Sequence, residues 1–181
     1  MRNYGLKSFG VKIIMNRIAF YWGIGGVLLL LGFAIFRLAP MAIELGNISL
    51  STLHWLCLIF SVVYMAYAEG YKGFHLAFAP RVVIRANYLR NNPRLSHVVL
   101  APLFCMGYLY ATRKRQIMSY ALTAMIICFI IIARMLPQPW RGILDAGVVV
   151  GLSLGIASIL YFLILFRKNP DSIAISPEVP A

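Results

Sequence analysis

Long apolar runs dominate the pattern of hydrophobic and polar positions along this chain. Three runs, residues 18–38, 50–69 and 143–166, carry charged residues only near their ends, and a fourth, residues 116–133, is slightly shorter. A helix needs about 20 apolar residues to cross a hydrocarbon core of roughly 30 Å, because each residue rises about 1.5 Å. The pattern therefore predicts an all-α integral membrane protein with four transmembrane helices.

A fifth apolar stretch, residues 98–111, is more difficult to assign. It is shorter than the other four, contains Pro102 and Gly107, and leads directly into the basic residues at 113–115. A segment of this length crosses the bilayer only if it is tilted and tightly packed. We expect a short re-entrant or interfacial helix on the cytoplasmic side, and the alternative is a protein with five spans.

Composition and charge support the membrane assignment and orient the chain. The chain of 181 residues is 61% hydrophobic and 12% charged, and its formal net charge is +12. With four spans, all basic residues except Arg37, Arg134 and Arg141 lie on one side. Cytoplasmic loops carry the excess of Lys and Arg. We therefore expect a multi-pass protein of the cell inner membrane with both termini cytoplasmic, and we interpret the charge as a topology signal rather than as a nucleic-acid site.

The same pattern divides the chain into three parts. Residues 1–17 form a basic cytoplasmic arm, either a short helix on the leaflet or an extended segment, and residues 18–166 form a single transmembrane helical domain. Residues 167–181 contain three prolines and few large apolar residues, which is typical of a disordered cytoplasmic tail.

One span carries small residues at a fixed interval. Gly147, Gly151 and Gly155 repeat every four residues, so they line one stripe where another helix can approach closely. The partner is either another span of this chain, such as the face with Gly23, or a helix of a second copy. In the same span, Asp145 follows Arg141 by four residues, and this spacing predicts a mutual ion pair.

The sequence offers little for metal or cofactor chemistry. The three histidines and three cysteines are scattered, and no zinc, haem, phosphate-loop or nucleophile motif is present. We therefore expect no metal and no cofactor. The scattered histidines and cysteines are His54, His75, His97, Cys57, Cys105 and Cys128.

Basic residues flank the short apolar stretch on both sides. If that stretch folds back, they meet at one leaflet, where each attracts anionic headgroups by about 1 kcal/mol. Positive-inside topology alone also predicts basic loops here. The candidate headgroup-binding residues are Lys72, Arg81, Arg85, Arg113, Lys114 and Arg115.

These features favour an accessory protein or complex subunit that binds membrane lipids, as a homo- or hetero-oligomer through its transmembrane helices. The alternative is a membrane enzyme or transporter that handles a phosphorylated lipid or isoprenoid. In that case Glu69 and His75, which lie among aromatic residues, are the candidate catalytic groups.

Overall fold

The computed structural model describes the backbone of residues 3–170, 173 and 175–179, with side chains from residue 14 onward. Every regular element within these ranges is helical. Four helical segments are long and apolar enough to cross a membrane, namely residues 14–47, 52–91, 113–135 and 140–168. The elements are α1 (Asn3–Glu44), η1 (Leu45–Asn47), α2 (Thr52–Met65), η2 (Ala66–Phe78), α3 (Ala79–Asn91), α4 (Leu95–Val99), α5 (Ala101–Cys105), α6 (Arg113–Met135) and α7 (Trp140–Lys168).

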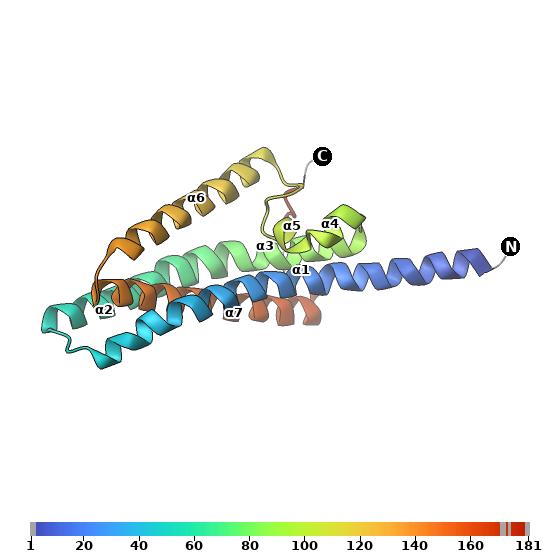
Figure 1. Ribbon diagram of the computed structural model, residues 1–181. Helices are drawn as coiled ribbons and strands as arrows, with labels where there is room; N and C mark the ends of the chain where they lie inside the picture. The colour runs from blue at the N-terminus through green and yellow to red at the C-terminus, as the bar shows by residue number, and fades with distance from the viewer. Residues whose placement is uncertain (1–2, 171–172, 174, 180–181) are drawn as a thin grey trace.

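The helices form a bundle in which α6 stands apart. Helices α1 and α7 and the continuous helix α2–η2–α3 lie side by side, whereas α6 leans away from them along most of its length (Figure 1). One end of the molecule, which we call the basic end, contains the start of α1, the end of α3, α4, α5, the start of α6 and the end of α7 (Figure 1). The predicted count of four long apolar helices is confirmed.

The second span continues well beyond the expected boundary at residue 69. Its start is capped at Ser51, whose hydroxyl accepts a hydrogen bond from the His54 backbone N–H at 3.4 Å. Gly70 and Gly73 do not end the helix. Instead, residues 66–78 widen into a π-helix, and Pro80 lies in the first turn of α3. Because the helix runs on from η2 into α3, Pro80 removes one backbone N–H donor at the junction, where residues 66–78 have widened into a π-helix.

The apolar stretch 98–111 is not one helix, and it contains no helix long enough to cross a membrane. It contains the short helices α4 and α5, which are interrupted at Leu100, followed by turns that lead to α6. Helix α5 packs closely on α1 at two glycines of α1. A methyl group added at Gly23 would lie 2.8 Å from Cys105 Sγ, and one added at Gly26 would overlap Pro102. Gly26 lies eight residues, or about 12 Å, inside the predicted first span.

The glycine stripe of α7 packs within the chain, and its partner is the second span rather than α1. A methyl group at Gly147 would lie 3.0 Å from the Ser61 carbonyl oxygen, and one at Gly155 would lie 2.7 Å from the Phe74 ring. The predicted pair in this helix is also present, with Arg141 Nε 3.8 Å from an Asp145 carboxylate oxygen.

Both chain ends differ in part from the sequence-based expectation. The backbone of the basic arm continues from Asn3 into the first span as one helix, and the side chains of residues 1–13 lie outside the described residues. The tail was predicted to be disordered, but its described residues contact the bundle. Ile173 is buried, the Thr112 N–H donates to the Glu178 carbonyl at 2.9 Å, and Arg85 donates to the Pro177 carbonyl.

Candidate functional site

The π-helix η2 directs Glu69 and His75 toward α7. The Glu69 carboxylate lies against Gly151, since a methyl group at that glycine would be 3.3 Å from Oε2. His75 Nδ1 lies 3.3 Å from the Ser158 hydroxyl, and its ring contacts Tyr161 and Phe162. π-helices are rare in proteins, and those that occur are often located at functional sites. Both candidate catalytic groups therefore share one helix interface.

Lys72 follows Glu69 by three residues but does not pair with it. The Lys72 ammonium group lies 5.0 Å from the centroid of the Tyr67 ring instead. Among the side chains described, Glu69 has no hydrogen bond or ion pair. No described group of three or more His, Cys, Asp or Glu residues is placed to hold a metal.

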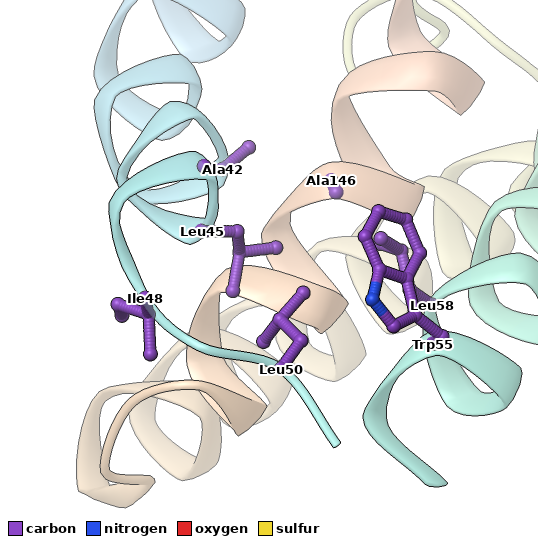
Figure 2. A pocket seen from close by; sticks show the side chains of 8 residues that line it. Ala42, Leu45, Ile48, Leu50, Trp55, Leu58 and Ala146 are labelled. Carbon is purple, nitrogen blue, oxygen red and sulfur yellow. The ribbon is translucent and has the colours of Figure 1, made fainter. Parts of the chain in front are cut away.

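Two pockets of moderate size open elsewhere, and neither is lined by Glu69 or His75. The first, of about 390 Å³, lies between the end of α1, the start of α2 and α7, and Figure 2 shows the Trp55 ring beside Leu50 and Leu58. Its lining side chains are mainly aliphatic and carry no charge, so this pocket can hold an apolar chain but offers no group for proton transfer.

The second pocket, of about 300 Å³, is polar and lies at the basic end. Its residues include Arg94 and His97, whose side chains both lie over Tyr110, with the guanidinium 5.4 Å and the imidazole 5.0 Å from the ring centroid. Burial and the positive charge of Arg94 lower the pKa of His97. No pattern along the chain indicates this group, because its residues come from two segments with a loop between them.

Arg85 differs most from its predicted role. Its side chain is only 1% exposed, and its guanidinium donates four hydrogen bonds to backbone carbonyls. The acceptors are Phe104 at 2.7 Å, Pro177 at 2.6 Å, Leu109 at 2.8 Å and Tyr110 at 3.1 Å. Four of its five N–H donors are therefore occupied, and Arg85 ties α3 to α5, to the following turns and to the tail rather than facing a headgroup.

The other predicted cations fall into two groups. Arg113 and Lys114 are exposed at the start of α6, as is Lys72 on η2. Arg81 and Arg115 come together from different helices around the Glu178 carboxylate, whose oxygens lie 3.9 Å and 3.7 Å from their Nε atoms. Glu178 was not predicted. Its only signal in the sequence is scarcity, because the chain has 5 acidic residues and 17 basic ones.

The comparisons with known proteins give no family for this chain. No protein-family model, curated protein or solved structure matches it.

Proposed function

We propose that this protein is a small multi-pass protein of the inner membrane that binds anionic lipid headgroups at its basic end. The observation that carries the proposal is the clustering of cations there. Arg81 and Arg115 meet in space, Arg113 and Lys114 are exposed beside them, and Arg167 and Lys168 end α7. By the positive-inside rule this end faces the cytoplasm, together with both chain termini.

We also propose that the protein is an accessory subunit of a larger assembly, and helix α6 supports this role. Of its residues only Ser119 and Ala133 are buried, and exposed apolar side chains cover the other faces. The glycine stripe of α7 is occupied within the chain, so a partner helix would use α6. Transmembrane helices associate through packing and interhelical hydrogen bonds. We therefore propose α6 as the face for a partner helix, from a second copy or another protein.

A direct test is to purify the protein in mild detergent and measure retained lipid by native mass spectrometry. We expect anionic lipid to be retained, with less lipid in a variant that replaces Arg113 and Lys114 by Gln, and we expect crosslinks from α6 to a partner. The control replaces Arg37 and Arg134, at the opposite end, by Gln. A monomer without retained lipid or crosslinked partner would rule out the proposal.

The enzyme or transporter alternative is favoured by one observation, the π-helix that turns Glu69 and His75 toward α7. It is tested by Glu69→Gln and His75→Gln, each followed by comparison of growth and lipid profile. An enzyme should lose its function with one of these substitutions, whereas a lipid-binding accessory protein should respond little, because neither residue belongs to the basic end's exposed cations.

A further inference from the structure

The contact between the tail and the two arginines is an ion pair without hydrogen bonds. Glu178 Oε1 lies 3.9 Å from Arg81 Nε, and Oε2 lies 3.7 Å from Arg115 Nε. Both Arg115 Nε and Glu178 Oε2 are buried without a hydrogen-bond partner among the described residues. A buried polar atom in this condition is unfavourable. The charges are therefore matched, but the donors of the arginines are not satisfied by this carboxylate.

The backbone of the tail limits how well the carboxylate can fit. The Glu178 carbonyl accepts from the Thr112 N–H at 2.9 Å, and the preceding Pro177 carbonyl accepts from Arg85 at 2.6 Å. Between these contacts Glu178 adopts φ +49°, which is an unfavourable left-handed conformation for a residue with a side chain. The tail is held by its main chain, and the side chain reaches the arginines only at ion-pair distance.

A phosphate group suits the same pair of arginines better. It offers more acceptor oxygens and up to two negative charges, and guanidinium groups bind it through paired hydrogen bonds. The site is partly accessible, because the side chains of Arg81 and Glu178 are 28% and 34% exposed, whereas that of Arg115 is 13% exposed. A ligand can therefore approach the arginines, and the Glu178 side chain can move away, without unfolding of α3 or α6.

We propose that Arg81 and Arg115 form a binding site for a phosphate monoester and that Glu178 is an internal competitor which the ligand displaces. This inference rests on the proposed headgroup binding and names its chemical class and its regulation. The tail then acts as a built-in anion that sets the threshold for binding. Removing the Glu178 charge should strengthen binding, which distinguishes this site from a diffuse basic surface.

The experiment titrates the detergent-solubilised full chain with short-chain phosphatidic acid by isothermal titration calorimetry. Glu178→Gln removes the competing charge but keeps the backbone contacts of the tail. We expect it to bind phosphatidic acid at least about fivefold more tightly, because a carboxylate no longer occupies the site between the two arginines. Arg81→Gln and Arg115→Gln should each weaken binding by about fivefold, the effect of roughly one cation near a membrane surface. Thermal melting of each variant verifies the fold.

The matched control is Arg90→Gln, an exposed arginine on the same helix as Arg81 that lies over the Phe20 ring and has no ion pair with Glu178 among the described residues. Its affinity should stay within about twofold of the unmodified protein. Equal losses for Arg81, Arg115 and Arg90, or unchanged affinity in Glu178→Gln, would overturn the inference while the proposed headgroup binding stands. If neither the unmodified protein nor Glu178→Gln binds, both proposals fail.

The source of the phosphate is decided by a second titration with inorganic phosphate and glycerol phosphate. Competition by these soluble ions, with the same dependence on Glu178, would support the site and assign it to a free phosphate compound. Binding of phosphatidic acid without such competition would support the site and assign it to a lipid headgroup.

Discussion

Arg85→Met removes the guanidinium group that joins three segments while keeping an unbranched side chain. Four carbonyls would lose their donor. Hydrogen bonds to charged groups contribute about 1.5–3 kcal/mol each, so simple addition gives more than about 6 kcal/mol. The desolvation of a buried guanidinium offsets several kcal/mol of this sum, and we expect a net loss of about 3 kcal/mol.

The assay is thermal unfolding of the purified protein in detergent, followed by circular dichroism. A loss of about 3 kcal/mol corresponds to a fall in Tm of roughly 6–12 °C for a chain of this size. Limited trypsin digestion should also become faster at residues 113–115, because the turns before α6 lose their anchor. The control is Arg90→Met on the same helix, which is exposed and should change Tm by less than about 2 °C. Equal Tm values for the two variants would refute this account of Arg85.

Three further predictions test the packing and topology. Gly147→Ala places a methyl group 3.0 Å from the Ser61 carbonyl oxygen, and we expect a loss of about 1–3 kcal/mol in thermal unfolding, whereas Gly25→Ala, with open space around it, should be neutral or slightly stabilising. Burial raises the pKa of the Cys105 thiol to about 12, so alkylation of Cys105 at pH 8, measured on its own peptide because Cys57 and Cys128 are also free thiols, should be slow until the protein is denatured. Rapid labelling of Cys105 in the native protein would contradict the packing of α5 on α1. Thr112→Cys, at an exposed position, should react with an impermeant reagent only from the cytoplasmic side, and labelling from outside would favour five spans.

Local patterns along the chain were sufficient for the number of long apolar helices and for the pair between Arg141 and Asp145. Both depend on residues close in sequence, because helix length and the spacing of four residues follow from the regular rise and turn of one helix. The interruption at Leu100 in the segment 98–111 was only partly predictable. Pro102 and Gly107 indicated an irregular segment, but not the close contact between α5 and α1.

The sequence by itself therefore determined the all-helical class, the number of long apolar helices and the uneven distribution of charge. The tertiary structure decided that the Arg85 cation is buried and that the Glu178 carboxylate lies between Arg81 and Arg115. Arg85 and Pro177 are separated by 92 positions, and their contact exists only because α3, α5 and the tail pack together. Hydrophobic periodicity describes one helix at a time, so it cannot distinguish an arginine that anchors backbone carbonyls from one that faces a headgroup.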